Sequence, residues 1–96
     1  MHKRNKVIEK LRALQPELEK RGIRHAYLIG SVARDQAGPD SDVDIIVDLS
    51  KPLGFEFFNL QDFLSEKISA RVELMTLEGL RPRVRREAEK DIVIAF

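Results

Sequence analysis

A chain of 96 residues leads us to expect one domain over residues 1–96, because single hydrophobic cores usually extend over about 100–150 residues. Its 43% hydrophobic and 34% charged residues argue against disorder and favour a folded domain with a well-hydrated surface. The 17 Lys and Arg nearly balance the 16 Asp and Glu, which argues against a protein that coats polyanions, and the absence of cysteine excludes disulfides and thiolate metal sites.

The first half of the chain alternates between helical and extended patterns. Apolar residues at offsets of four, three and four over about residues 3–21 predict an amphipathic helix, which Pro16 either kinks or divides into two short helices. The apolar run over 25–29 predicts a short buried strand. Turn-forming residues follow at 37–40, and the alternation over 42–49 predicts a strand with an acidic start.

The second half adds a core helix, a strand and a less regular end. Mostly helical spacings over 55–68 predict a helix whose phenylalanines pack in the core rather than stack on bases. The run over 71–75 predicts a strand parallel to 42–49, because a right-handed crossover through the helix joins them. We expect a helix with a solvated basic face within 77–90, and a short strand or docked tail over 91–96. The predicted fold class is α/β (α+β), a small mixed sheet of three to four strands packed against helices on one face.

Three acidic residues on neighbouring strands form the first candidate site. Asp42 and Asp44 project from one face of a strand about 7 Å apart, close enough to share two cations about 3.5–4 Å apart. If Val72 and Leu74 pack toward the core, Glu73 shares the open face with both aspartates. Hard oxygen ligands select Mg²⁺ or Mn²⁺, which take up phosphate oxygens of a nucleoside triphosphate. The alternative for an isolated Asp-x-Asp is a solvated strand edge.

Gly30, Ser31 and Arg34 form the second candidate site, a phosphate-binding turn. Glycine lets the chain approach a phosphate closely, and the Ser31 hydroxyl can cap the following helix or join its free amides in facing an anion. The Arg34 guanidinium matches phosphate oxygens, and a surface ion pair is an equally good interpretation of this residue. The two candidate sites lie about ten residues apart, and together they are far less expected by chance than either alone.

At these residues the chain resembles the minimal nucleotidyltransferase (MNT) proteins of the polymerase-beta nucleotidyltransferase superfamily, the antitoxins of HEPN/MNT toxin–antitoxin pairs. The resemblance rests on Gly-Ser-Val-Ala-Arg at 30–34, Ser-Asp-Val-Asp-Ile-Ile-Val at 41–47 and Val-Glu-Leu-Met-Thr at 72–76. The order of predicted helices and strands also resembles that family from end to end. It implies the minimal nucleotidyltransferase fold.

The resemblance implies a role for each candidate residue and an activity. Gly30 and Ser31 would hold the nucleotide phosphates, Asp42 and Asp44 would ligate two Mg²⁺ or Mn²⁺ ions, and Glu73 would ligate the catalytic ion and help activate the acceptor hydroxyl. The implied reaction transfers AMP from ATP to a tyrosine hydroxyl of a cognate HEPN ribonuclease toxin, which silences the toxin. We therefore expect a hetero-oligomer with that toxin.

Two departures from the family pattern keep other functions open. The family usually has glycine where this chain has Asp35, and commonly aspartate where it has Glu73. One alternative is an antitoxin of weak catalytic power that neutralises its toxin by binding alone, and another is a nucleotidyltransferase with a small-molecule acceptor. No apolar run approaches the roughly 18 residues that span a bilayer, so we expect a cytoplasmic protein without membrane or direct nucleic-acid contacts.

Overall fold

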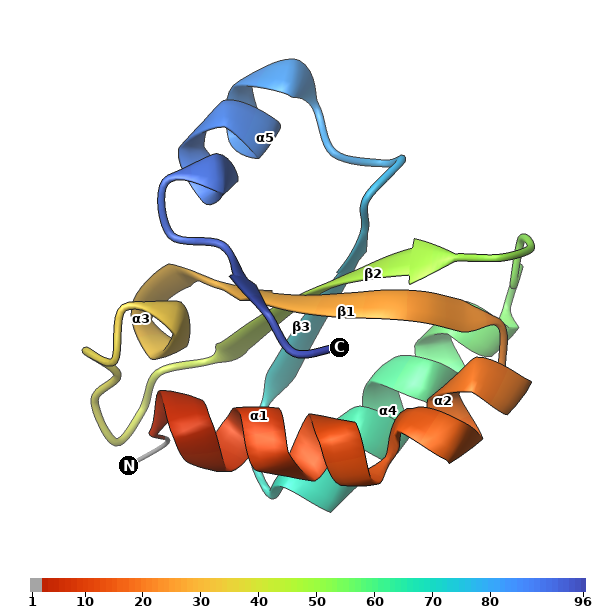
Figure 1. Ribbon diagram of the computed structural model, residues 1–96, viewed down its shortest axis with the longest axis horizontal. Coiled ribbons are helices and arrows are strands. Elements are labelled where there is room, and N and C mark those ends of the chain that lie inside the picture. Colours follow the sequence, from red (N-terminus) through yellow and green to blue (C-terminus); the bar gives the residue numbers. More distant parts are fainter. Residues whose placement is uncertain (1–2) are drawn as a thin grey trace.

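A computed structural model describes residues 3–96 and shows a four-stranded sheet with helices on both faces (Figure 1). In chain order the elements are α1 (Arg4–Ala13), α2 (Gln15–Lys20), β1 (Ile23–Ile29), α3 (Gly30–Ala33), β2 (Val43–Leu49), α4 (Glu56–Ile68), β3 (Val72–Thr76), α5 (Pro82–Glu89) and β4 (Val93–Ile94). None of the helices within residues 3–96 combines the length and the apolar character needed to cross a membrane.

The amino-terminal segment forms two helices rather than one kinked helix. Pro16 lies in the first turn of α2, where a missing amide hydrogen costs nothing, and Leu14 between the helices accepts a hydrogen bond from the Leu18 amide. Val7, Leu11 and Leu18 are buried, as the predicted apolar stripe requires. The second of the two alternatives for this segment is therefore confirmed.

The sheet has the strand order β3-β2-β1-β4 and is mixed. β1 pairs antiparallel with β2 and with β4, whereas β2 pairs parallel with β3, as the crossover through α4 predicts. β1 begins at Ile23, two residues earlier than predicted. The register shifts between Ile23 and His25, so Arg24 and His25 are both exposed. That irregularity interrupts the alternation by which a strand is recognised in sequence. The predicted fold class is confirmed, but the prediction of helices on one face only is wrong, because Ala88 of α5 packs on the second face of the sheet.

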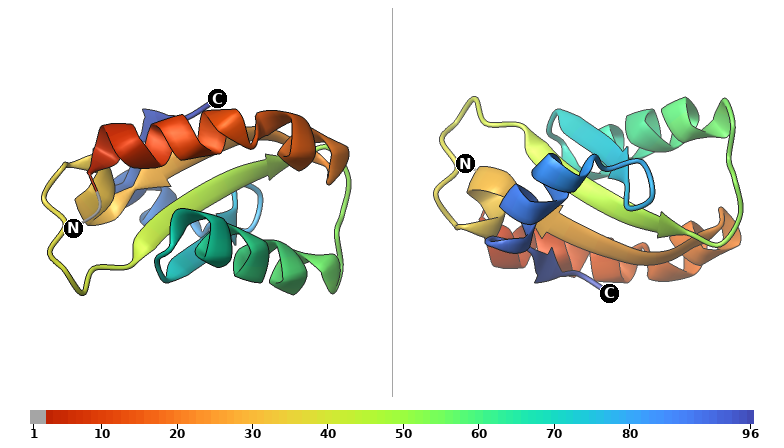
Figure 2. Two further views of the ribbon diagram at one scale, coloured as in Figure 1. Left: turned by 90° about the horizontal axis from the view of Figure 1, so that it is seen from below. Right: turned by 90° about the horizontal axis from the view of Figure 1, so that it is seen from above.

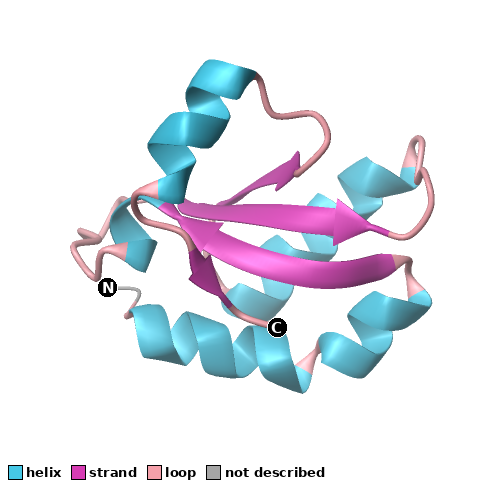
Figure 3. Ribbon diagram, turned by 45° about the horizontal axis from the view of Figure 1, so that its top comes forward, coloured by secondary structure: helices cyan, strands magenta, loops and turns pink. Residues whose placement is uncertain are grey.

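The two faces of the sheet are covered unequally. α1, α2 and α4 pack on one face and bury the main core, while α5 crosses the other (Figure 2). Figure 3 shows the four strands as one twisted sheet between these layers. Ile46, which shares its face with Asp44, is fully buried in a smaller cluster with Ile29 and Ala88 of α5. Ala88 is the only buried residue of α5, so this helix covers its face of the sheet loosely.

The prediction that the phenylalanines of the second long helix pack in the core is wrong for two of them. The side chains of Phe55 and Phe58 are 89% and 62% exposed. α4 buries a single stripe of residues spaced four apart, Leu60, Leu64 and Ile68, and neither of these phenylalanines lies on it. Phe63 is half-buried beneath the guanidinium of Arg21, 4.3 Å from its ring centre.

We expect Leu64→Ala to lower the free energy of unfolding by about 2–5 kcal/mol, because it empties a fully buried position between α4 and the sheet. Phe58→Ala, on the exposed side of the same helix, is the control and should change it by about 0.5 kcal/mol or less. Urea denaturation followed by circular dichroism measures both. A larger loss in the Phe58 variant would contradict the assignment of the buried face.

Candidate active site

Asp44 and Glu73 lie side by side at the start of the parallel strand pair. Asp44 on β2 is aligned with Glu73 on β3 on one side and with Ile29 at the end of β1 on the other. Val43 and Ile45 are buried in the main core, so Asp44 points to the opposite face, where its side chain is half-buried. The strand register therefore places both carboxyl groups on the same face of the sheet, as predicted.

The surroundings of Asp44 disfavour its charged form. Burial, the charges of Glu73 and Asp42, and a hydrogen bond with the Glu73 side chain together raise the pKa of Asp44 from 3.8 to about 6. Such a cluster of carboxyl groups holds excess negative charge that a divalent cation neutralises. The site is therefore electrostatically suited to a hard cation.

Asp42 lies beside this pair but is not joined to it. Its carboxylate is 3.9 Å from Arg71 Nε in an exposed ion pair, although its charge still acts on Asp44. Within residues 3–96, no three acidic or histidine side chains are gathered closely enough to hold a metal ion. The structure thus brings Asp44 and Glu73 together and leaves Asp42 at the margin.

Gly30 lies directly against the Asp44 carboxylate. Its φ is +75°, a conformation that residues with side chains rarely adopt, and a Cβ built on it would lie 2.6 Å from Asp44 Oδ2. Ser31 follows in the first turn of α3 and is half-buried. No side chain caps α3, so the expectation that Ser31 caps it is wrong, and the first amides of the helix lack intrahelical partners.

Arg34 is held by the carboxy-terminal part of the chain. Its Nη1 lies 3.0 Å from Asp91 Oδ2, and its Nε donates to Gln36 Oε1 at 3.3 Å. Together with Gly30 and Glu87 of α5, the ion pair borders a pocket of about 230 Å³. Arg34 thus lines the same pocket as Gly30, and it makes the ion pair that was its alternative interpretation.

We expect Asp91→Asn to leave stability within about 1 kcal/mol, because the ion pair with Arg34 is partly exposed. If Arg34 serves the nucleotide, the substitution frees its guanidinium and tightens ATP binding, whereas Arg34→Ala weakens it. Equilibrium titration with a fluorescent ATP analogue measures both effects. Equal affinities for wild type and both variants would limit Arg34 to a structural role.

Asp35, the first departure from the family pattern, has a structural explanation. Its φ is +58°, where glycine is favoured and aspartate is among the best tolerated of the other residues. The Asp35 carboxylate accepts a hydrogen bond of 3.1 Å from the Arg4 amide at the start of α1. The Asp35 carboxylate therefore stabilises the amino terminus of α1, and this hydrogen bond orients its negative charge toward α1.

Sequence reasoning missed the partners that orient these side chains. Asp91 is 57 residues from Arg34, and no local pattern connects them. Arg71 immediately precedes the β3 strand, and strand pairing places it beside Asp42. Arg24 Nη2 binds Asp48 at 3.3 Å, a cross-strand pair that the antiparallel register of β1 and β2 would have indicated.

A mixed sheet that presents paired carboxyl groups beside a glycine turn is typical of α/β enzymes that bind phosphates together with divalent cations. The nucleotidyltransferase domain family matches residues 4–95, and the chain belongs to this family. The predicted resemblance to minimal nucleotidyltransferases and the prediction of a nucleotidyltransferase enzyme are both confirmed.

Relatives and solved structures agree with this assignment. The protein adenylyltransferase MntA of Thermococcus cleftensis is 33% identical over 85 residues, which are 86% of each chain. A solved structure provisionally identified as a minimal nucleotidyltransferase superposes with a TM-score of 0.74 at 27% identity, covering 90% of this chain and 93% of the other. A toxin–antitoxin structure with AMP-PNP has a TM-score of 0.72 at 22% identity, covering 97% of this chain and 72% of the other, and shows likeness of fold.

Proposed function

We propose that this chain is an Mg²⁺-dependent protein adenylyltransferase that transfers AMP from ATP to a tyrosine hydroxyl of a HEPN ribonuclease toxin and thereby acts as its antitoxin. The observation that carries the proposal is the carboxyl pair of Asp44 and Glu73 beside the Gly30 turn. Support also comes from the relative named a protein adenylyltransferase, and from a solved structure of a tri-AMPylated HEPN toxin of Shewanella oneidensis with its MNT antitoxin, which this chain matches in fold.

The donor set fits the divalent cations that the family implies. Asp44 and Glu73 would hold them, with Asp42 joining once its exposed ion pair with Arg71 yields, which costs little because solvent screens that pair. When bound, such ions lower the pKa of an attacking hydroxyl and neutralise charge on a departing phosphate group. The crowding that raises the pKa of Asp44 is the chain's own contribution to cation affinity.

The residues around this pair would position ATP and the acceptor. The Gly30 backbone and the Ser31 hydroxyl hold phosphate oxygens, and Arg34 reaches the same group from the pocket beside α5. The tyrosine oxygen bonds to the α-phosphorus while the bond to the pyrophosphate oxygen breaks, and Glu73 accepts the hydroxyl proton. Because attack is in line, no covalent intermediate on the chain is needed.

The acceptor protein would complete the site. The Cα radius of gyration of the described residues is 12.3 Å, the Glu73 side chain is exposed, and the Asp42 side chain is partly exposed. A single small domain cannot enclose ATP and a protein side chain together, so the toxin forms the second wall and excludes water. Residues 1–96 would act as one nucleotidyltransferase domain in the cytoplasm, where ATP and the ribonuclease meet.

The test is transfer of label from ATP to the protein encoded beside this chain, which we expect to be a HEPN ribonuclease. With Mg²⁺ and ATP labelled at the α-phosphate, the HEPN protein should gain label, and ATP labelled at the γ-phosphate should give none. Asp42→Ala/Asp44→Ala should abolish labelling. Labelling that persists in the double variant would remove both aspartates from the reaction.

A binding-only antitoxin is the second candidate, because Asp42, Asp44 and Glu73 do not form a ready three-ligand cation site in the part of the chain described here. In that case the double variant would still neutralise ribonuclease activity, and would do so without ATP. Measuring ribonuclease activity with and without ATP for both forms separates the two candidates. Screening small acceptors with labelled ATP tests the third, a nucleotidyltransferase without a protein substrate.

A further inference from the structure

A guanidinium lies on the same face of the sheet as the acidic side chains of the candidate site. Arg71 and Glu73 flank Val72, which is buried in the main core, so both of their side chains point to the opposite face. Arg71 Nε lies 3.9 Å from Asp42 Oδ1. In the part of the chain that the structure describes, neither Asp44 nor Glu73 forms an ion pair. Arg71 is therefore the one cation paired with this group of carboxylates in residues 3–96.

The backbone fixes where Arg71 stands relative to Asp42. The Val43 amide donates to the Arg71 carbonyl at 2.9 Å, so the residues that precede β2 and β3 lie next to each other. The Val72 amide donates to Ser65 Oγ at 3.1 Å, which anchors the start of β3 to α4. The approach of Arg71 to Asp42 therefore follows from the register of the parallel strand pair.

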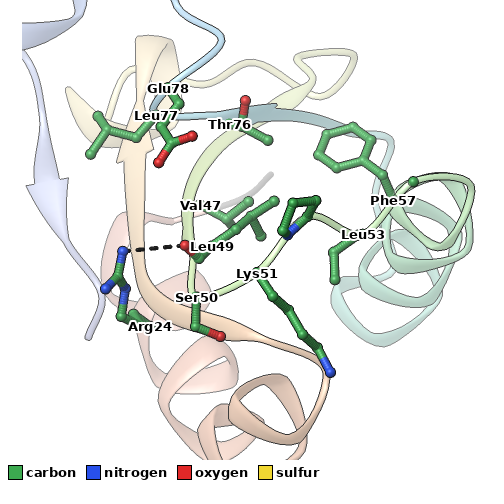
Figure 4. Close-up of a pocket in the computed structure, with 12 residues that line it drawn as sticks. Arg24, Val47, Leu49, Ser50, Lys51, Leu53, Phe57, Thr76, Leu77 and Glu78 are labelled. Carbon is green, nitrogen blue, oxygen red and sulfur yellow. Dashed lines mark hydrogen bonds between the residues drawn. The ribbon is translucent and has the colours of Figure 1, made fainter.

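The Arg71 side chain, in contrast, is held weakly. Its contact with Asp42 is longer than a hydrogen bond, and the side chain is 87% exposed. At the other end of β2, Arg24 Nη2 lies 3.3 Å from Asp48 Oδ1 and also donates to the Leu49 carbonyl at 3.2 Å (Figure 4). No hydrogen bond of this kind holds the Arg71 side chain within residues 3–96. A stronger cation can therefore displace it.

Arg71 and a divalent cation compete for Asp42. A cation bound to Asp42 would stand beside the guanidinium, and the two like charges repel each other. Asp42 is thus free for a cation only in the fraction of chains in which its ion pair is open, and the apparent affinity falls in proportion to that fraction. For an exposed ion pair, that fraction is about one sixth to two fifths, so the pair weakens cation binding about 2- to 6-fold.

We propose that Arg71 is a positioning residue of the cation site, which holds Asp42 apart from Asp44 and Glu73 until a divalent cation displaces it. The inference rests on the proposed function for the identity of that cation. It explains why the described residues contain no ready three-ligand site although all three carboxyl groups lie near one another: the third ligand is already paired. Arg71 thereby sets the cation concentration at which Asp42 joins the site.

Binding of Mn²⁺ to the nucleotide-free chain tests this role, because electron paramagnetic resonance counts free Mn²⁺ without any AMP transfer. Arg71→Ala should tighten binding about 2- to 6-fold. Arg71→Lys keeps a charge that can pair with Asp42, so it should stay closer to wild type. Thermal midpoints should not change, because the Arg71 side chain is exposed. Unchanged or weaker Mn²⁺ affinity of Arg71→Ala, or no Mn²⁺ binding by any form, would overturn the proposal.

Arg24→Ala is the matched control for loss of a positive charge. Arg24 also pairs with an aspartate, but Asp48 and Asp42 are six residues apart along an extended segment, roughly 20 Å at the usual rise of a strand. At an ionic strength of about 0.15 M, exposed charges that far apart are screened from each other. The Arg24 variant should therefore bind Mn²⁺ as wild type does.

The same substitution in an Asp42→Asn background shows whether Arg71 acts through Asp42. Without that carboxylate, Arg71→Ala should no longer tighten Mn²⁺ binding. An equal gain in both backgrounds would overturn the proposal, because it would mean that Arg71 only repels the cation from a distance.

The measurement uses neither ATP nor an acceptor, so its failure is distinguishable from failure of the proposed function. If Mn²⁺ affinity depends on Arg71 through Asp42 and wild type transfers no AMP, the proposed function fails while the role of Arg71 stands. If wild type transfers AMP and Mn²⁺ affinity is independent of Arg71, only the role of Arg71 fails.

Discussion

Replacing Asp44 with asparagine is expected to abolish AMP transfer and at the same time to make the folded chain more stable. Transfer should fall at least about 100-fold, because Asp44 is a half-buried member of the carboxyl cluster and one preorganised electrostatic group is typically worth that much. The amide keeps the size of the side chain and removes a charge that the fold disfavours. Activity and stability therefore change in opposite directions at this residue.

The sign of the stability change follows from the pKa. Asp44 has a pKa of about 6 in the folded chain against 3.8 as its ordinary value, so the folded state favours the protonated form. The wild type gains stability as the pH falls from about 6 to about 4 and loses it as the pH rises through 6. Two pKa units correspond to about 3 kcal/mol, and solvent screening of this half-buried group reduces the expected gain of Asp44→Asn at pH 7 to about 1 kcal/mol.

Urea denaturation at pH 4 to 8, in the presence of a chelator, measures this effect. The stabilisation by Asp44→Asn should be present at pH 7 and should vanish near pH 4. Asp48→Asn is the matched control, because Asp48 lies on the same strand but is paired with Arg24. It should keep AMP transfer and should not gain stability at pH 7. A destabilised Asp44 variant would show that the carboxyl pair is not a source of repulsion.

The strand alternation over 42–49 was enough to predict which side chains share a face with Asp44. Burial of Val43, Ile45 and Val47 leaves Asp44 on the opposite face, and the parallel register adds Glu73. Both inferences use contacts that are local or that one crossover determines. For this reason the carboxyl pair and the fold class could be predicted from the sequence.

Features that depend on contacts distant in sequence could not be predicted. Arg34 forms its ion pair with Asp91, which lies beyond α5 in the chain. The Asp35 carboxylate accepts a hydrogen bond from the Arg4 amide on α1, a contact that no local pattern indicates. The exposure of Phe55 and Phe58 is a failure of another kind. Helical spacing identifies several apolar positions on α4, but only the packing of α4 against the sheet selects which of them are buried.

Gly30→Ala is expected to destabilise the chain and to reduce AMP transfer about 100-fold, because it displaces the Asp44 carboxylate from its position beside the turn. Two terms contribute to the loss of stability. A left-handed conformation costs a residue with a side chain about 1–2 kcal/mol, and the new Cβ at 2.6 Å from Asp44 Oδ2 adds a clash of about 1–3 kcal/mol.

Gly54→Ala separates these two terms. Gly54 also has a positive φ, +58°, but a Cβ there would meet no atom within 4 Å, so this variant should lose only the conformational term.

A double-mutant cycle between Gly30→Ala and Asp44→Ala then isolates the clash. Without the carboxyl group, the nearest atom of residue 44 to the new Cβ is its own Cβ at 3.8 Å, an ordinary contact. The two substitutions should therefore couple by about 1 kcal/mol or more in urea denaturation. Strict additivity would mean that the turn and the carboxyl pair are energetically independent, and the close approach of Gly30 would then have no part in holding Asp44 in place.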